Sequence, residues 1–303
     1  MEKGVLLLAF GGPTRGEEVA PFLKNVTAGH SIPQARIDLV LEQYRMIGGT
    51  SPLNELTFQQ SKSLEELLQK KNVPVKVYVG MRHWPPLIQE TLLKMKEDGI
   101  KKAVGIVLAP HRSQASWEKY LEKVLQVQKE MGPETPQIEF CAPWHEHPLW
   151  IEAISSRIEE SIRANPEIKE NLWLFTAHSI PLEMDAKSNY SQQIKRTAEL
   201  VAEKLQKKNW EVVYQSRSGR PQDPWLEPDI NDKLTELDTS GIKSVTVIPI
   251  GFICDHVEVL YDLDVKAKET ARKLNISFHR VKTVNAHPKF IEMLSEIVIQ
   301  HAS

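Results

Sequence analysis

The chain has little cysteine and no excess of charge of one sign. Two cysteines, Cys141 and Cys254, occur in 303 residues without a CxxC spacing. One chain cannot build a disulfide framework or a four-thiolate iron–sulfur cluster from them, so a reducing, cytoplasmic setting is expected. The 38 basic and 40 acidic side chains leave a formal charge of -2. Nucleic acid is therefore not expected as a partner.

Long apolar runs and nucleotide-binding glycine patterns are also absent. The N-terminal run VLLLAF, residues 5–10, is too short for a signal peptide or a membrane span and is expected to form a buried strand. The sequence predicts no transmembrane segment and at most peripheral membrane contact. Neither GxGxxG nor GxxxxGK[ST] occurs, so neither a dinucleotide nor a nucleoside triphosphate is indicated.

Apolar runs alternate with amphipathic segments along the whole chain, which predicts an α/β fold with parallel sheets. In the first half, strands are expected at residues 5–10, 75–81 and 103–110, and helices near 58–71, 88–98 and 117–131. The cycle restarts after the turn-rich GPETP, with strands expected at residues 137–143, 171–181, 210–216 and 244–252 and helices at 148–164, 191–207 and 257–274. These runs predict two domains, residues 1–135 and 136–303, and the last helix, 288–301, could pack against either.

Ligands of open α/β sheets bind beyond the carboxyl ends of the strands, so the residues after each apolar run are the candidates for a site. His178 ends such a run in LFTAHSIP. A neutral imidazole there can accept a proton near neutral pH or bind ferrous iron. A histidine that only hydrogen bonds its own loop is the simpler interpretation of a lone residue of this kind.

A dense group of ionisable residues follows the strand in VIPIGFICDHVEVLYDLD. If a helix begins near Asp255, Glu258 and Asp262 stand four residues apart on one face. Two stacked carboxylates repel each other, which suggests a cation nearby or a solvated path for one. Alternatively, Asp255 caps the helix and the acids complement its dipole. The next position on this face is Lys266, so the acidic row has two members.

The loop YQSRSGRPQDPWLEPD carries Arg217, Arg220 and Trp225. The arginines could bind carboxylates of a ligand and Trp225 offers a flat apolar face, although a solvated surface loop is an equally good interpretation. At the ends of the first strands, Phe10 and Met81, together with Trp84, could line an apolar slot for a large flat molecule. Aromatic residues in such places more often belong to the core.

Five ordered segments, LLLAFGGP, QYRMIGGTSPL, TAHSIP, QSRSGRPQDPWLEPD and PIGFICDHVEVLYDLD, resemble those of ferrochelatases. The resemblance extends over nearly the whole chain, and AFGGP followed by VAPFLKNVTAGHSIP is most similar to the bacterial type that metallates coproporphyrin III. It implies two Rossmann-like, chelatase-type domains with a central cleft. It also implies insertion of Fe²⁺ as a substrate into a bound porphyrin, for haem biosynthesis, without an organic cofactor or iron–sulfur cluster.

The resemblance also implies roles for particular residues. The catalytic histidine and acid of the family match His178 and Glu258, and Asp262 matches a further metal-binding acid. Phe10 stands where part of the family has a metal-contacting tyrosine, and Lys266 stands where relatives often continue the acidic row. Porphyrin contacts are expected from the residues at the matching strand ends and loops: Phe10, Tyr44, Arg45, Ser51, Met81, Arg217, Trp225 and His256. The backbone of residues 27–30 matches a propionate-binding region, with His30 where an arginine is common.

Two other functions remain open at this point. A chelatase of the same superfamily could load a metal into a sirohydrochlorin-type tetrapyrrole. A haem-binding or metal-binding protein could hold its ligand without turnover.

Overall fold

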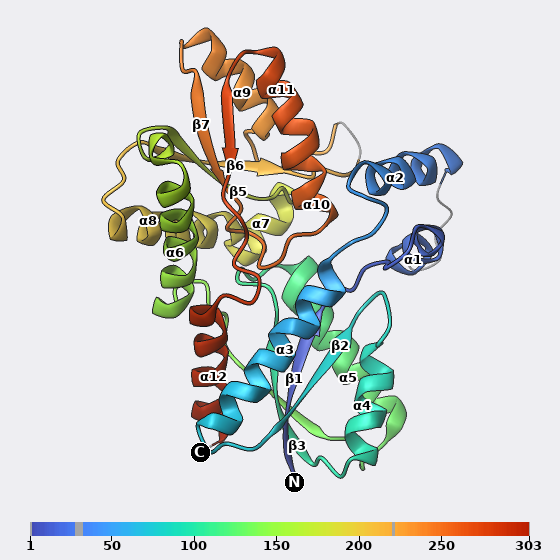
Figure 1. The fold of residues 1–303 in the computed structure, drawn as a ribbon. Helices are drawn as coiled ribbons and strands as arrows, with labels where there is room; N and C mark the ends of the chain where they lie inside the picture. Colours follow the sequence, from blue (N-terminus) through green and yellow to red (C-terminus); the bar gives the residue numbers. More distant parts are fainter. Residues whose placement is uncertain (1, 28–32, 220–221, 303) are drawn as a thin grey trace. The chain divides into compact units, whose positions relative to one another are not determined.

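The computed structural model describes residues 2–27, 33–219 and 222–302, which form two compact units (Figure 1). The first contains Met1–Ala109, Ala115–Pro143 and Asn285–Ser303. The second contains Pro110–Gln114 and Trp144–Val284. The α/β class with parallel sheets is confirmed, because each unit is built on a four-stranded parallel sheet with helices around it.

The sheet of the first unit has the order β2-β1-β3-β4, and all its neighbouring strands are parallel. Its strands are β1 (Lys3–Ala9), β2 (Lys76–Met81), β3 (Lys102–Val107) and β4 (Gln137–Phe140). The unit's helices are α1 (Val19–Val26), α2 (Gln34–Met46), α3 (Leu53–Lys70), α4 (Ile88–Glu97), α5 (Lys119–Met131) and α12 (Pro288–Ala302). A 3₁₀ turn, Gly16–Glu18, precedes α1, and a π-helical turn, Gln114–Glu118, precedes α5. Residues 5–8 of β1 are completely buried, which explains why its sequence is apolar without alternation.

The fourth strand and the last helix both belong to the first unit. β4 pairs with β3, and a Cβ at Gly105 would lie 2.7 Å from Ile138 and 2.8 Å from Phe140, so the two strands pack without room for a side chain. Near the C-terminus, the Gln60 amide of α3 donates to the Asn285 carbonyl, and α12 packs along α3 (Figure 1). The structure thus differs from the predicted division at residue 135, because β4 completes the first sheet.

The sheet of the second unit has the order β6-β5-β7-β8 and is also parallel throughout. Its strands are β5 (Leu172–His178), β6 (Trp210–Gln215), β7 (Ser244–Ile248) and β8 (Ser277–Arg280). Its α-helices are α6 (Pro148–Ala164), α7 (Leu182–Ser188), α8 (Tyr190–Lys204), α9 (Ile230–Thr239), α10 (Val257–Leu260) and α11 (Lys268–Lys273). A 3₁₀ turn, Pro166–Lys169, follows α6, and a π-helical segment, η4 (Asp262–Ala267), lies between α10 and α11.

One face of the second sheet positions the candidate site. Leu172 and Leu174 of β5 pack into a buried cluster with residues of α9, α10, η4 and α11. Because side chains alternate along a strand, His178 lies on this same face, at the end of the row that these leucines begin. The sheet face that packs against this cluster therefore also carries the His178 imidazole, at the end of β5.

The predicted elements match the structure best where hydrophobic periodicity is long. α6 has the predicted bounds, Pro148–Ala164, with proline at the first helical position. The single helix expected over residues 257–274 is instead divided into α10, η4 and α11, and β8 was not predicted. None of the helices within the described residues combines the length and hydrophobicity that a membrane span requires.

Candidate functional site

His178 is the last residue of β5 and its imidazole lies at the strand exit. Its Nδ1 is hydrogen bonded to the Ser179 carbonyl oxygen, which can only accept, so Nδ1 carries a proton. The other ring nitrogen, Nε2, lies 3.5 Å from Oε1 of Glu258. The side chains are 27% and 39% exposed, so both remain accessible to a ligand. The imidazole of His178 and the carboxylate of Glu258, both predicted for the site, therefore lie within ion-pair distance of each other.

A close approach between the segment after β7 and the end of β5 brings Glu258 to His178. The segment after β7 passes directly over the end of β5, where a Cβ at Gly251 would lie 2.7 Å from Ala177. The Gly251 amide also donates to the Thr176 carbonyl over 3.0 Å. Because glycine has no side chain, the segment at Gly251 can lie directly against β5. The chain then enters α10 beside the imidazole of His178.

Two side chains fix Glu258 within α10. The amide of Gln215 donates to the main-chain carbonyl of Glu258, and Gln215 is itself the register partner of His178 in the sheet. Its side chain is buried, with 1% of the residue exposed. Nε2 of His256 lies 3.2 Å from Oε2 of Glu258, so each carboxylate oxygen faces one imidazole. The buried amide thus links the helix that carries the acid to the strand beside His178.

Asp262 begins the π-helical segment and is held by the exit of β6. Its carboxylate accepts a hydrogen bond from the hydroxyl of Ser216, which has a left-handed backbone with φ of 62°. A non-glycine residue in this region is uncommon and is kept there by surrounding contacts. π-helical turns frequently occur at functional sites.

The pKa values of His178, Glu258 and Asp262 are shifted in different directions. Burial lowers the pKa of His178, but the charge and hydrogen bonding of Glu258, the Ser179 carbonyl and the charge of Asp262 together outweigh burial, so the pKa of His178 is raised overall. Burial raises the pKa of Glu258, but the two imidazoles outweigh it and leave that pKa well below its usual range. The pKa of Asp262 is raised, first by burial and further by the charge of Glu258, against the hydrogen bond from Ser216. Glu258 is thus the persistent anion and Asp262 the acid that protonates more readily.

The loop with Arg217 and Trp225 lies beside the exit of β5. Trp225 forms an antiparallel bridge with Pro181, and the Ser179 hydroxyl donates to the Leu226 carbonyl. The Arg217 guanidinium donates to the Asp223 carbonyl over 2.8 Å, within its own loop. Arg220 lies outside the described residues. The segment around Trp225 therefore lies beside residues 179–181, which follow His178 in the second unit.

In the first unit, Phe10 follows β1 and is 38% exposed. Its ring packs on the His83 imidazole with centroids 4.4 Å apart, and the Arg82 guanidinium lies 5.6 Å from its centroid. The Arg82 Nε–H donates to His83 Nε2, and burial, with the charge of Arg82, lowers the pKa of His83 to about 4. His83 is therefore neutral at physiological pH.

The other first-unit candidates have different surroundings. Met81 is completely buried and Tyr44 is 3% exposed, so both pack in the core, which differs from the predicted porphyrin contacts. Ser51 is buried, and its hydroxyl accepts from the Leu53 amide at the start of α3. The Arg45 side chain is 80% exposed and pairs with Glu42. Residues 28–30 of the predicted propionate region lie outside the described residues.

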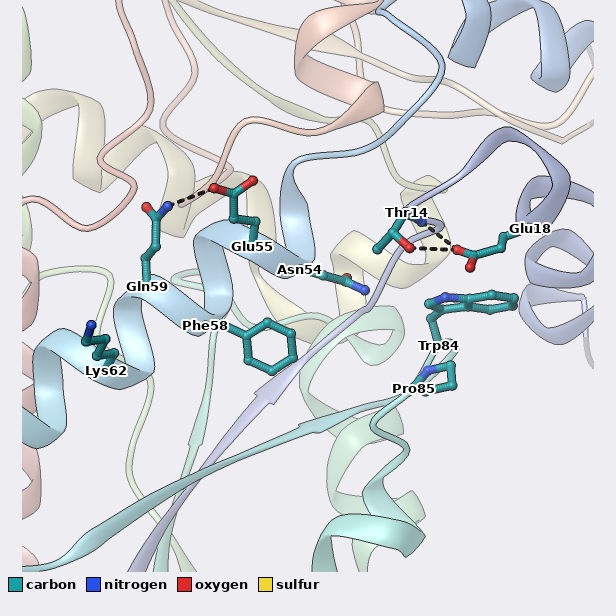
Figure 2. Close-up of a pocket in the computed structure, with 9 residues that line it drawn as sticks. All are labelled: Thr14, Glu18, Asn54, Glu55, Phe58, Gln59, Lys62, Trp84 and Pro85. Atoms are coloured by element: carbon teal, nitrogen blue, oxygen red, sulfur yellow. Dashed lines mark hydrogen bonds between the residues drawn. The ribbon is translucent and has the colours of Figure 1, made fainter.

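A cavity of about 740 Å³ in the first unit is lined by α3 on one side and the segments after β1 and β2 on the other (Figure 2). Figure 2 shows the rings of Phe58 and Trp84 facing this space. Trp84 is the one lining residue that the sequence had suggested for an apolar slot. The other residues that line the cavity are Thr14, Glu18, Asn54, Glu55, Gln59, Lys62 and Pro85.

Several partners of the acidic segment were not predicted. Asp255 is not a helix cap, because α10 begins after His256 and has no side-chain cap. Its carboxylate instead pairs with Arg280 of β8, which also binds Asp264. Gln215 and Ser216 were also missed, although both end a strand, and the strand-exit argument that selected His178 could have found them. Within the described residues, no group of three or more His, Cys, Asp or Glu side chains is arranged to hold a metal ion.

Comparison with protein-family models gives one match over nearly the whole chain. The model described as Ferrochelatase matches residues 2–302. A ferrochelatase of Rhodopirellula baltica is 36% identical over 97% of this chain and 84% of that protein. The coproporphyrin III ferrochelatase of Nocardia farcinica is 36% identical over 99% of this chain and 88% of that protein. A protein of the same description from Mycobacteroides abscessus is 37% identical over 97% and 88%.

Solved structures of chelatases share the fold. The sirohydrochlorin chelatase SirB of Bacillus subtilis subspecies spizizenii, in complex with cobalt, matches with a TM-score of 0.60 and 10% identity, over 100% of this chain and 96% of that one. CbiX, described as the terminal enzyme of sirohaem biosynthesis in denitrifying bacteria, matches with a TM-score of 0.54 and 12% identity, over 99% of each chain. At these identities the likeness concerns the fold alone.

Proposed function

Because the chain belongs to the ferrochelatase family, we propose that it inserts Fe²⁺ into coproporphyrin III, with His178 and Glu258 at the site of metal insertion. The observation that carries the site assignment is the 3.5 Å distance between His178 Nε2 and Glu258 Oε1 at two adjacent strand exits. Ferrochelatases perform this chemistry on a porphyrin and iron, and no organic cofactor or iron–sulfur cluster is proposed. We also propose a cytoplasmic setting, because two cysteines without a CxxC spacing are too few for a disulfide framework.

Metallation requires that the two pyrrole N–H protons of the porphyrin leave as the metal enters. His178 can accept such a proton at Nε2, because its Nδ1 proton is already donated to the Ser179 carbonyl. The anionic Glu258 stabilises the imidazolium that results and, with the Ser179 carbonyl and Asp262, raises the pKa of His178 against the effect of burial. The same carboxylate reduces the cost of bringing Fe²⁺ out of water.

Glu258 and Asp262 have different roles in this proposal. Environments that move the pKa values of two acids apart assign them to different tasks. Glu258, with its lowered pKa, remains charged and attracts the metal, whereas Asp262, with its raised pKa, is suited to take a proton and release it to solvent. The hydroxyl of Ser216 orients Asp262 for this transfer.

The preference for coproporphyrin III rests on relatives that carry this description and are 36% identical over 88% of their length. Coproporphyrin III has more propionates than protoporphyrin IX, so it needs more cationic or backbone donors at its rim. Arg217 and Arg220 are the side chains predicted for carboxylate contacts, and Arg220 lies outside the described residues.

The test is an anaerobic metallation assay with purified protein, Fe²⁺ and a panel of coproporphyrin III, protoporphyrin IX and sirohydrochlorin, followed by the shift of the Soret band. We expect many turnovers per protein with coproporphyrin III and a lower kcat/KM with protoporphyrin IX. Turnover with sirohydrochlorin alone would assign the chain to the other chelatase class. A spectral change that stops at one equivalent of ligand would instead identify a carrier protein. His178→Ala is expected to abolish turnover.

A further inference from the structure

The helix that carries Glu258 is too short to hold its own position. α10 has four residues, begins after His256 without a side-chain cap, and passes into the π-helical segment η4. A single helical turn leaves its end groups unsatisfied and is unstable by itself. The position of the Glu258 carboxylate must therefore be set by residues outside α10.

One guanidinium group contacts the chain on both sides of α10. Arg280, the last residue of β8, binds Asp264 of η4 with its Nε 2.6 Å from Oδ1 and its Nη2 2.7 Å from Oδ2. Its Nη1 lies 3.0 Å from Oδ1 of Asp255, which precedes α10. The side chains of Arg280 and Asp255 are 12% and 17% exposed, so their contact is largely shielded from water, whereas Asp264 is 33% exposed.

We propose that Arg280 is a positioning residue for metal insertion, which acts by fixing the segment from Asp255 to Asp264 and thereby the carboxylate of Glu258. This inference rests on the proposed function. Arg280 contacts the acids that flank α10 and has no contact with Glu258 itself among the interactions described. A planar guanidinium is required because two of its nitrogens bind one carboxylate while the third reaches another.

The charges of the cluster support this role. Burial lowers the pKa of Arg280, but Asp264 and Asp255 outweigh it and raise that pKa overall, so the guanidinium remains charged. Without it, Asp255 and Asp264 would lose the guanidinium that joins the segments on either side of α10. Glu258 lies in the segment between these two acids and would move with it. Residues that orient metal-binding side chains typically change activity on the order of 10-fold to 100-fold when replaced.

A double-mutant experiment separates positioning from simple stabilisation. Arg280→Gln is combined with Glu258→Gln, and kcat/KM for Fe²⁺ is measured at saturating coproporphyrin III, with porphyrin affinity measured by fluorescence quenching. If Arg280 acts through Glu258, its replacement lowers kcat/KM about 10-fold in the wild-type background and about 2-fold or less when Glu258 is already glutamine. Porphyrin affinity should stay unchanged. An equal loss in both backgrounds, or no loss in either, overturns the proposal.

Arg272→Gln is the matched control, because Arg272 makes the same two-pronged contact with Glu269 on the neighbouring helix α11 but is 71% exposed. It should leave kcat/KM unchanged. Arg280→Lys keeps the charge but loses the fork, so it should fall between wild type and Arg280→Gln. If Arg280→Gln does not fold, Asp264→Asn takes its place in the double-mutant comparison, with the same expected and contradicting results.

The experiment also distinguishes failure of this inference from failure of the proposed function. Should wild-type protein not metallate any porphyrin, or should Glu258→Gln turn over normally, the proposed function or its site is wrong. Should wild type be active and Glu258→Gln impaired while Arg280→Gln matches wild type, only the role of Arg280 is refuted.

Discussion

Replacing Glu258 with glutamine keeps the size of the side chain and its contact with His256 but removes the charge beside His178. At 3.5 Å, a pair of opposite charges interacts by about 1 kcal/mol in water and about 5 kcal/mol at an effective dielectric constant of 20. Because 39% of the Glu258 side chain is exposed, solvent screens the pair and a value of about 2 to 3 kcal/mol is reasonable. If this energy stabilises the transition state, its loss slows metallation roughly 30-fold to 160-fold.

The same substitution should change the pH dependence of the rate. His178 must be neutral to accept a proton, so the rate rises with pH through its pKa. In the wild type, Glu258 raises that pKa above its ordinary value. In Glu258→Gln the effect of burial remains without the opposing carboxylate, so the pKa of His178 falls. The acid limb of the rate profile should therefore move to lower pH, although the maximal rate is smaller.

The assay is the initial rate of coproporphyrin III metallation from about pH 5.5 to 9, with porphyrin affinity measured at each pH. Glu183→Gln is the control, because Glu183 is an exposed acid of α7 that pairs with Lys187. It should change neither the rate nor the profile. An acid limb that stays in place in Glu258→Gln, or a loss of porphyrin affinity as large as the loss of rate, would refute the reasoning.

Three further predictions concern other residues of the two units. Gln215→Leu leaves the Glu258 carbonyl without its buried donor. It should lower the free energy of unfolding in urea by about 1 to 3 kcal/mol and reduce the metallation rate. An unchanged free energy and an unchanged rate would contradict this prediction. Lys266→Glu adds a third acid beyond Asp262 and should lower the apparent KM for Fe²⁺ about 2-fold to 5-fold; a higher KM would disprove it. His83 stays neutral in the folded state down to about pH 4, whereas the unfolded chain binds a proton below about pH 6.5, so stability is lost as pH falls between these values. His83→Gln should remove up to about 3 kcal/mol of that loss, seen as a flatter dependence of the urea midpoint on pH.

The strand-exit argument correctly brought His178 and Glu258 close together, but it did not predict the residues around them. His178 and Glu258 were selected because each follows a buried strand of a parallel sheet, and the sheet's edge brings such residues together. The same argument failed for Met81, which ends β2 but is completely buried. Whether a residue at a strand end faces a ligand or the core depends on the side of the sheet to which it points and on the segment that covers it. Sequence position alone does not contain that information.

Local sequence determined the elements of this protein. Apolar runs predicted every strand of the described residues except β8, amphipathic periodicity predicted α6 and most other long helices, and the ordered motifs were sufficient to indicate the ferrochelatase family. These features depend on neighbouring residues, so they can be derived from the order of side chains along the chain.

Tertiary structure decided which strands share a sheet and what holds the site. β4 joined the first sheet because it pairs with β3 across Gly105, and no local signal distinguishes that pairing from one with the following strand. The donor to the Glu258 carbonyl stands 43 residues away in the sequence, and Asp255 meets its guanidinium partner 25 residues away. Hydrogen bonds of this kind depend on the distances and orientations created when the sheet assembles, which is why only the folded chain reveals them.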